Sequence, residues 1–254
     1  MPIKRYLLPM TLVVIMQGAH AVDEGGVNAY RPTTSNPATL PTPGQLELEF
    51  GGLHVKTGSA RDDSLPYLFK LGFSEQWGIL LGGDAYLKSR DEQGNRVNGI
   101  GDTTVTAKRA FVIDEATAYG LELSAKLPTA KKPLGSGKTD YTLNGILSHD
   151  IGKVHVDINL GATRLGAPDT ETSRMQTALS SAFSMPLSSD WNGMTELSGI
   201  RHVGAPTTAK LLAAVSYSPG KRYAVDVGLA RGLNAASQDW SLFTGLVIPV
   251  AKLW

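Results

Sequence analysis

The stretch YGLELSAKL at residues 119–127 alternates apolar and polar side chains with a period of two. Its odd-numbered positions are apolar, whereas Glu122 and Lys126 stand among the even-numbered ones. Successive side chains of a β-strand point to opposite faces of a sheet, so this pattern predicts a strand with one apolar and one polar face.

The same alternation recurs along the chain from Gln45 onward. It is clear at 45–50, 67–73, 154–160 and 223–229, and weaker at 77–87, 102–111, 140–148, 174–185, 191–201, 208–217 and 240–250. The chain therefore has twelve candidate strands. Half-buried antiparallel sheets and membrane barrels both give this alternation, so strand pattern alone does not distinguish them.

The composition of the 254 residues excludes several classes of protein. The 24 basic residues nearly balance the 23 acidic ones, which argues against a nucleic-acid partner. With no cysteine, the chain has no disulfide scaffold, thiolate metal site or thiol nucleophile. No apolar run approaches the roughly 18 residues of a membrane helix, and the 28 glycines and 14 prolines suit many strands and turns.

The first residues have the features of a secretory signal peptide. Lys4 and Arg5 precede the apolar stretch 6–16, and the sequence Ala-His-Ala ends at Ala21. We expect residues 1–21 to be removed by cleavage after Ala21, as in an exported bacterial protein. The mature chain would then hold 22 basic and 23 acidic residues, a net charge of −1.

Residues 22–44 form a second region of different composition. Four prolines, Pro32, Pro37, Pro41 and Pro43, stand among Thr, Ser and Asn. They disfavour helix and interrupt ladder hydrogen bonding, so we expect an extended or irregular segment that lies in the periplasm or enters the barrel lumen. Residues 45–254 would then form the β-domain.

The connections between the candidate strands alternate in length. Those after odd-numbered strands cover 56–65, 88–101, 128–139, 164–173, 202–207 and 231–239 and are mostly long; those after even-numbered strands cover 74–76, 112–116, 149–152, 186–190 and 218–221 and are short. Short periplasmic turns opposite long external loops are typical of outer-membrane barrels. The final residue, Trp254, is an aromatic of the kind that barrel-assembly machinery reads. We therefore predict an all-β, antiparallel transmembrane β-barrel of about 12 strands in the bacterial outer membrane, rather than a soluble exported sandwich.

Several phrases of the sequence, taken together, resemble a known family. They are RP at 31–32, TLP at 39–41, GQLELE at 44–49, GIGD at 99–102, KLPTA at 126–130, GSGKTD at 135–140 and QDWSLFTG at 238–245. In this order they resemble the bacterial outer-membrane transporters of the phenol-degradation (meta-pathway) β-barrel type. The resemblance covers nearly all of the mature chain and implies a barrel that passes small, in part aromatic, molecules. The chain departs from such barrels by ending on Trp254 instead of Phe, and Lys252 interrupts the last alternation, so the register of the last strand stays open.

Charged residues on the polar strand faces are the candidate lumen lining, because charge facing lipid costs a few kcal/mol at mid-depth. They are Glu47, Glu49, Lys70, Asp84, Lys108, Glu122, Lys126, Asp140, Asp157, Glu196, Lys210 and Asp226. Mixed signs predict ion pairs across the lumen. The eight acidic against four basic members argue against an anionic solute.

No catalytic, metal or cofactor site is predicted. The stretch Gly135 to Thr139 looks like the end of a phosphate-binding loop, but Lys132 stands where that loop needs a glycine. The histidines of the mature chain, His54, His149, His155 and His202, lack the spacing of metal ligands.

A barrel enzyme that modifies lipids is a weaker alternative. Asn144 and Ser148 share a strand face near His149, but His149 falls in a short turn at the periplasmic rim. An acyl hydrolase of the outer leaflet would need its histidine at the other rim.

We therefore predict a monomeric channel or transporter for passive or facilitated diffusion of small molecules, with aromatic or hydrophobic compounds among them. The expected partners are outer-membrane lipid, the barrel-assembly machinery and the solute. The main alternative is a structural or surface-binding barrel without transport.

Overall fold

The computed structural model describes residues 26–254, so the predicted signal peptide lies outside the described residues. This part of the chain is all-β apart from one short 3-10 turn, η1 (Pro219–Lys221). No helix within it has the length and apolar character needed to cross a membrane. The strands are β1 (Gln45–Thr57), β2 (Ala60–Gly72), β3 (Trp77–Arg90), β4 (Arg96–Gly99), β5 (Thr103–Val112), β6 (Thr117–Leu127), β7 (Asp140–Ile151), β8 (Val154–Arg164), β9 (Met175–Pro186), β10 (Trp191–His202), β11 (Thr208–Tyr217), β12 (Ala224–Gly232) and β13 (Trp240–Lys252).

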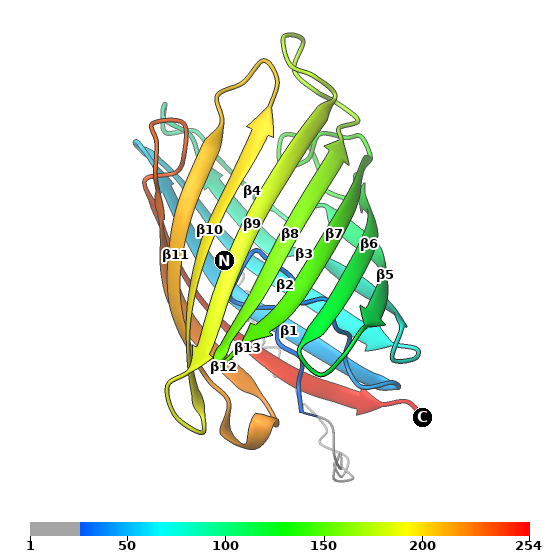
Figure 1. Cartoon of the computed structure of the whole chain (residues 1–254). Helices are drawn as coiled ribbons and strands as arrows, with labels where there is room; N and C mark the ends of the chain where they lie inside the picture. The colour runs from blue at the N-terminus through cyan, green and yellow to red at the C-terminus, as the bar shows by residue number, and fades with distance from the viewer. Residues whose placement is uncertain (1–25) are drawn as a thin grey trace, which may run out of the picture.

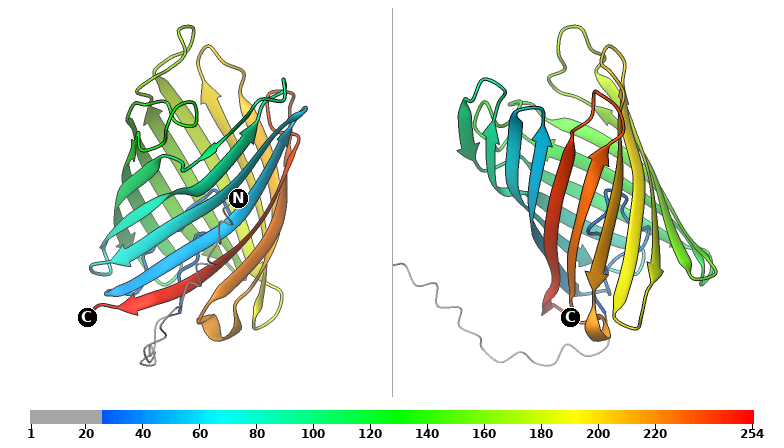
Figure 2. Two further views of the ribbon diagram at one scale, coloured as in Figure 1. Left: turned by 180° about the vertical axis from the view of Figure 1, so that it is seen from behind. Right: turned by 90° about the vertical axis from the view of Figure 1, so that its left-hand side faces the viewer.

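Twelve of these strands close into an antiparallel barrel (Figures 1 and 2). Each pairs with its neighbour in sequence, β3 pairs with β5, and the first strand closes the barrel by pairing with the last, from Gln45 opposite Lys252 to Lys56 opposite Trp240. Closure leaves no unpaired sheet edge in the wall, which a bilayer requires. The predicted twelve-stranded barrel is confirmed.

Two predicted connections are wrong. The first, 56–65, is a two-residue turn at residues 58 and 59, because β1 and β2 continue pairing to Thr57 opposite Ala60. Gly58 has φ +58°, a conformation that favours glycine. The end of this hairpin carries exposed charges such as Arg61 and Asp62, so no apolar alternation marks it in the sequence.

The second is the predicted loop 88–101, which contains β4. This short strand pairs with β3 alone, from Gly99 opposite Leu87 to Arg96 opposite Arg90, on the same edge of β3 as β5 and beyond the end of the β3–β5 ladder. Four residues are too few for a period of two to be recognised.

Prolines within the wall coincide with shifts in register. Pro66 of β2 lies where the β2–β3 ladder shifts, and Pro249 of β13 lies opposite Glu47, next to the shift in the β1–β13 ladder. Proline cannot donate a ladder hydrogen bond, and a bulge accommodates it. Beyond the shift, Lys252 still pairs with Gln45, which fixes the register of the last strand.

The outer surface of the wall is apolar over the middle of the barrel. Exposed members of this surface include Leu121, Leu123, Leu143, Leu160, Leu179, Leu197, Leu211, Val227, Leu229 and Leu242. They alternate along each strand with the polar inner residues, as Leu121 and Leu123 do with buried Glu122. An apolar exterior around a polar interior is the arrangement of a barrel that faces lipid, as in the outer membrane.

Aromatic side chains gather at the short-turn end. Arg109 lies with its guanidinium 4.6 Å from the ring centre of Trp77 and 4.9 Å from that of Phe111, and Trp191 packs at 5.0 Å against Tyr217. Such residues mark the membrane interface. In the turn 113–116 the Ala116 N–H donates to the carboxylate of Asp114 at 2.9 Å, which lowers the pKa of that exposed group.

A charge on the apolar exterior should destabilise the barrel. Leu123 is 60% exposed on central β6, and we expect Leu123→Arg to lower the free energy of unfolding from phospholipid vesicles by about 2–4 kcal/mol. The control Leu233→Arg changes a residue of similar exposure, 51%, in the loop 233–239 and should be nearly neutral. Urea titrations followed by gel mobility before and after boiling measure both. Equal stabilities would show that the face around Leu123 contacts water.

Candidate functional site

The twelve predicted lumen residues all lie on the inner side of the wall. Nine are buried and three, Asp84, Lys126 and Lys210, are partly exposed. Cross-strand pairing brings opposite charges together, with Glu47 opposite Lys70, Lys108 opposite Glu122 and Lys126 opposite Asp140. Paired residues of neighbouring strands share a face, so these contacts follow from register.

The most buried of these ion pairs centres on Lys70. Its Nζ lies 3.0 Å from Glu47 Oε2 and 2.5 Å from Glu49 Oε1, and it also donates to the carbonyl of Asn28. The side chains of Lys70 and Glu47 have no exposed surface. Three acceptors around one ammonium compensate the cost of removing it from water.

Two further lysines pair with carboxylates, Lys108 with one and Lys126 with two, since Asp102 Oδ2 lies 3.9 Å from Lys126 Nζ. Lys108 Nζ lies 3.0 Å from Glu122 Oε1 and donates to the carbonyl of Pro37 at 2.5 Å. Lys126 Nζ lies 2.6 Å from Asp140 Oδ2. In residues 26–254, Lys210 is the lysine of the predicted set that has no carboxylate within 4.0 Å; its Nζ donates to Thr34 Oγ1 at 2.9 Å.

Residues 26–44, here called the strap, contact these inner side chains. The strap runs inside the barrel near its short-turn end (Figure 1, dark blue). Its tip is held by Glu196, whose Oε2 accepts hydrogen bonds of 2.7 Å from the backbone N–H groups of both Thr34 and Ser35. Ser35 also donates to Ser180 Oγ at 2.8 Å.

Amide side chains hold the next residues of the strap. Asn36 donates from its backbone to Asn159 Oδ1 and from its side chain to Glu122, each at 3.0 Å. The N–H of Ala38 donates to Ser148 Oγ at 2.8 Å. The strap contains no helix or strand, only an isolated bridge between Pro43 and Gly72, so these inner side chains satisfy part of its backbone.

Two side chains of the strap reach across the lumen. Tyr30 is buried, with its ring centre 4.4 Å from Lys70 Nζ and 4.2 Å from Lys108 Nζ, and its hydroxyl donates to the carbonyl of Thr39 at 2.8 Å. Arg31 Nε lies 3.1 Å from Asp226 Oδ2. Tyr30 therefore separates two ammonium groups that would otherwise repel each other.

Arg31 depends on two glycines of the wall. Its guanidinium lies against Gly51 and Gly245, which face each other across β1 and β13, and a Cβ on either would overlap it. Its Nη2 donates to the carbonyl of Thr244 at 3.0 Å. The absence of side chains here leaves the space that the guanidinium occupies.

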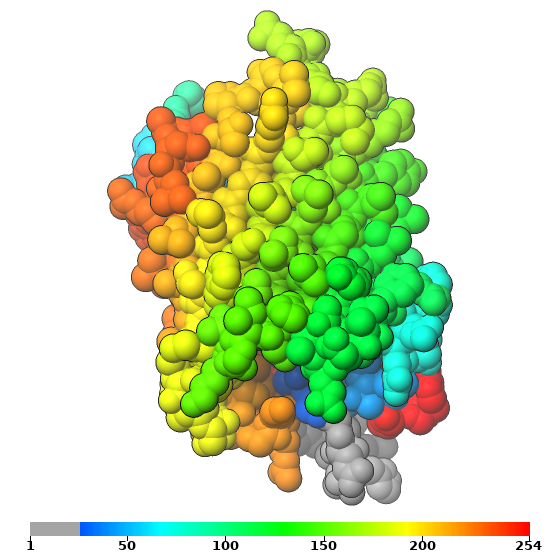
Figure 3. Space-filling model, in the orientation of Figure 1, coloured from blue at the N-terminus to red at the C-terminus, as the bar shows by residue number. Residues whose placement is uncertain are grey.

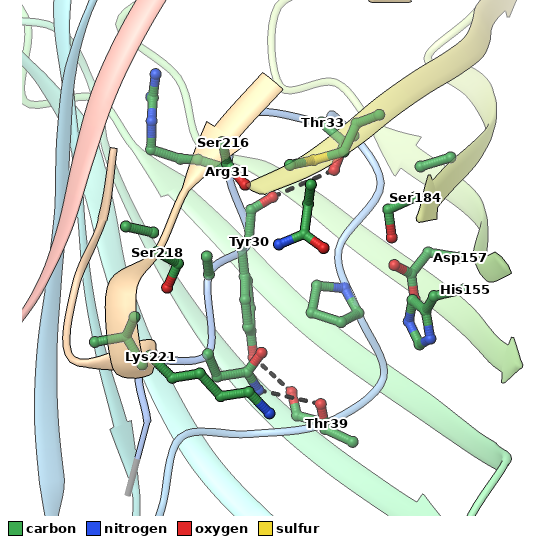
Figure 4. Close-up of a pocket in the computed structure, with 18 residues that line it drawn as sticks. Tyr30, Arg31, Thr33, Thr39, His155, Asp157, Ser184, Ser216, Ser218 and Lys221 are labelled. Atoms are coloured by element: carbon green, nitrogen blue, oxygen red, sulfur yellow. Dashed lines mark hydrogen bonds and ion pairs between the residues drawn. The ribbon is translucent and has the colours of Figure 1, made fainter. Parts of the chain in front are cut away.

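The strap lies between two cavities. The lower cavity, of about 450 Å³, is at the short-turn end (Figure 4), and its lining includes Tyr30, Thr33, His155, Asp157, Ser216 and Lys221. The upper cavity, of about 290 Å³, is at the long-loop end, and its polar lining is Thr34, Ser180, Ser198, Lys210, Ser237 and Gln238. Consecutive strap residues, Thr33 and Thr34, thus face different cavities. The space-filling view shows the strap in the opening at the short-turn end (Figure 3).

The motifs considered for chemistry are distributed over different parts of the barrel. The loop from Gly135 to Thr139 leads into strand β7 rather than a helix. His149 is hydrogen-bonded to Thr117 Oγ1 at 3.0 Å, and His155 lies 2.5 Å from Asp150 Oδ1. Within residues 26–254, no group of three or more His, Asp or Glu side chains has the arrangement of a metal site.

Sequence reasoning missed the roles of Tyr30, Arg31, Asn36 and Asn159. The first three lie in a segment without periodicity, and Asn159 carries no charge that would mark it as a lumen residue. Asn159 stands two positions after Asp157, on the same strand face, so the alternation that selected Asp157 also points to it.

The sequence matches, over residues 29–248, the family model described as "Putative MetA-pathway of phenol degradation". No curated protein matches it. Among solved structures, the COG4313 outer membrane channel from Pseudomonas putida F1 is similar with a TM-score of 0.67 at 14% identity, over 83% of this chain and 97% of that one. The NanC porin is similar with a TM-score of 0.59 at 10% identity, over 80% of this chain and 100% of that one. The CymD monoaromatic hydrocarbon channel is similar with a TM-score of 0.51 at 9% identity, over 82% of this chain and 89% of that one.

Proposed function

The chain belongs to the phenol-degradation MetA-pathway family, and from this and the lumen we propose that it is an outer-membrane channel for diffusion of small molecules, aromatic or hydrophobic compounds among them. The observation that carries the proposal is the pair of cavities on the two sides of the strap. Twelve strands enclose more space than the roughly eight whose inner side chains fill a barrel. The two cavities leave unfilled space on either side of the strap.

The names of similar structures support the same class of function. They are described as an outer membrane channel, a porin and a monoaromatic hydrocarbon channel. In this proposal the twelve inner charged residues line the solute path, and their ion pairs set its width and selectivity. The path runs past the strap tip at Thr34.

The proposal assigns no chemistry to the protein. The four histidines of residues 26–254 form hydrogen bonds to aspartates, to Thr117 and to the carbonyl of Ser173, and none to a serine hydroxyl.

We propose further that the protein acts as a monomer, inserted into the outer membrane by the barrel-assembly machinery. We also propose that the region 22–44, of which the structure describes 26–44 as the strap, belongs to the channel and that residues 45–254 form its wall.

Reconstitution in a planar bilayer tests the proposal. We expect the purified full mature protein to give discrete, ohmic current steps in KCl, because polar side chains line both cavities. Gel mobility before and after boiling controls for folding. Folded protein that inserts without any current would contradict the channel and favour the structural or surface-binding barrel.

A further inference from the structure

Lys210 and Ser198 form a polar pair in the wall of the upper cavity. They stand directly opposite each other on β11 and β10 and therefore share the inner face. Ser198 is 7% exposed, and its hydroxyl has no hydrogen-bond partner within residues 26–254. A buried hydroxyl without a partner is unfavourable, so a ligand that accepted its hydrogen bond would be stabilised at this position.

The ammonium of Lys210 has hydrogen-bond donors that are not engaged by the described chain. It carries three donors, of which one is directed to Thr34 Oγ1, and no carboxylate of the described chain lies within 4.0 Å of it. Cross-strand neighbours place their Cβ atoms about 4.5–5.5 Å apart. Because the two side chains start from neighbouring positions on one face, the Lys210 ammonium and the Ser198 hydroxyl can both be directed toward one small ligand, each donating to one oxygen of a single carboxylate.

Three other polar side chains of the cavity already have partners. Ser237 Oγ bonds to the backbone of Ala209 and to Asn234, and the amide of Gln238 donates to Ser241. Ser180 Oγ accepts from Ser35. This leaves the Lys210–Ser198 pair as the polar anchor of the cavity.

The rest of the lining suits an apolar group. Ala178 and Ile200 pair with each other and lie one step along the same inner face from Ser180 and Ser198. Together with the methyl group of Thr208, opposite Ile200, they give the cavity its apolar wall. The volume of about 290 Å³ accommodates a single ring.

We propose that the upper cavity is a binding subsite for a small amphipathic anion, a carboxylate carried on a compact apolar body such as one ring. The carboxylate binds Lys210 Nζ and Ser198 Oγ, and the apolar body lies against Ala178 and Ile200. The inference rests on the proposed channel, since it names the class of solute that pauses in that path.

Benzoate is the probe for this subsite. Full-length mature protein in a planar bilayer is titrated with sodium benzoate, and the block is normalised to each variant's own KCl current. We expect concentration-dependent block by benzoate, with acetate and benzyl alcohol at least about tenfold weaker because each lacks one half of the ligand. Equal block by acetate, or by benzyl alcohol, would overturn the proposal.

Two variants locate the site. Lys210→Gln should raise the apparent Kd of benzoate at least about tenfold, since a charge-assisted hydrogen bond is lost, and Ser198→Ala should raise it about threefold or more. The matched control Lys221→Gln removes the same charge from the lower cavity and should retain the wild-type Kd. Unchanged Kd in both Lys210→Gln and Ser198→Ala, or an equal loss in Lys221→Gln, would place the block elsewhere.

Isothermal titration of benzoate into the detergent-solubilised protein separates the two proposals. If the protein carries current but does not bind benzoate, the channel proposal stands and the subsite proposal is wrong. Saturable binding that needs Lys210, in folded protein that carries no current, overturns the channel and retains the subsite as a ligand site of the barrel.

Discussion

Deleting residues 26–41, most of the strap, should raise single-channel conductance in KCl at least about twofold. The strap crosses the lumen between the lower and upper cavities, so its removal merges them into one wider path. Current steps in a planar bilayer measure the effect, after gel mobility has shown that the variant is folded. If the folded deletion variant kept the wild-type conductance, the strap would not be the part of the lumen that limits the ion current.

A second variant keeps the strap in the chain and weakens its attachment. Glu196→Ala with Asn159→Ala removes the acceptors of the N–H groups at the tip, and we expect noisier, larger currents. Adding Ser35→Cys and Ser180→Cys gives a reversible control, because their hydroxyl oxygens lie 2.8 Å apart and the chain has no other cysteine. Oxidation should restore wild-type conductance and reduction should remove it.

The barrel itself could be predicted from the sequence because the outer face of each strand contacts lipid and the inner face contacts a polar lumen. Lipid outside and polar lumen inside impose a period of two wherever a strand crosses the membrane, as in residues 119–127. The pattern fails where both faces meet water, which is why the hairpin turn at Gly58 and the short strand β4 were missed. The alternation of long and short connections still indicates a membrane barrel although 56–65 is a short turn and 88–101 contains β4, because the remaining long loops lie at one end.

The arrangement inside the lumen could not be predicted from the same pattern. The strap has no periodicity, and its path depends on backbone N–H groups that meet particular side chains, as at Glu196. Counting charges argued against an anionic solute, but the count ignores pairing. Lys70, Lys108 and Lys126 are neutralised by neighbours, while Lys210 keeps a free charge toward the upper cavity.

Replacing Lys70 by Met should be the most destabilising single change in the wall. The substitution leaves the carboxylates of Glu47 and Glu49 buried without the ammonium that joins them. Removing one partner of a buried ion pair costs about 3–5 kcal/mol, because the remaining charge is unpaired. Methionine fills much of the same volume, so the loss would reflect charge rather than a cavity.

Equilibrium urea titration of the protein refolded into phospholipid vesicles measures this effect. Lys153→Met, in the exposed turn between β7 and β8, is the control and should change the free energy of unfolding by less than about 0.5 kcal/mol. Lys70→Met combined with Glu49→Gln should recover part of the loss, since one uncompensated carboxylate is then neutral. If Lys70→Met were as stable as Lys153→Met, the carboxylates would be hydrated, and water would have to reach the periplasmic half of the lumen beneath the strap.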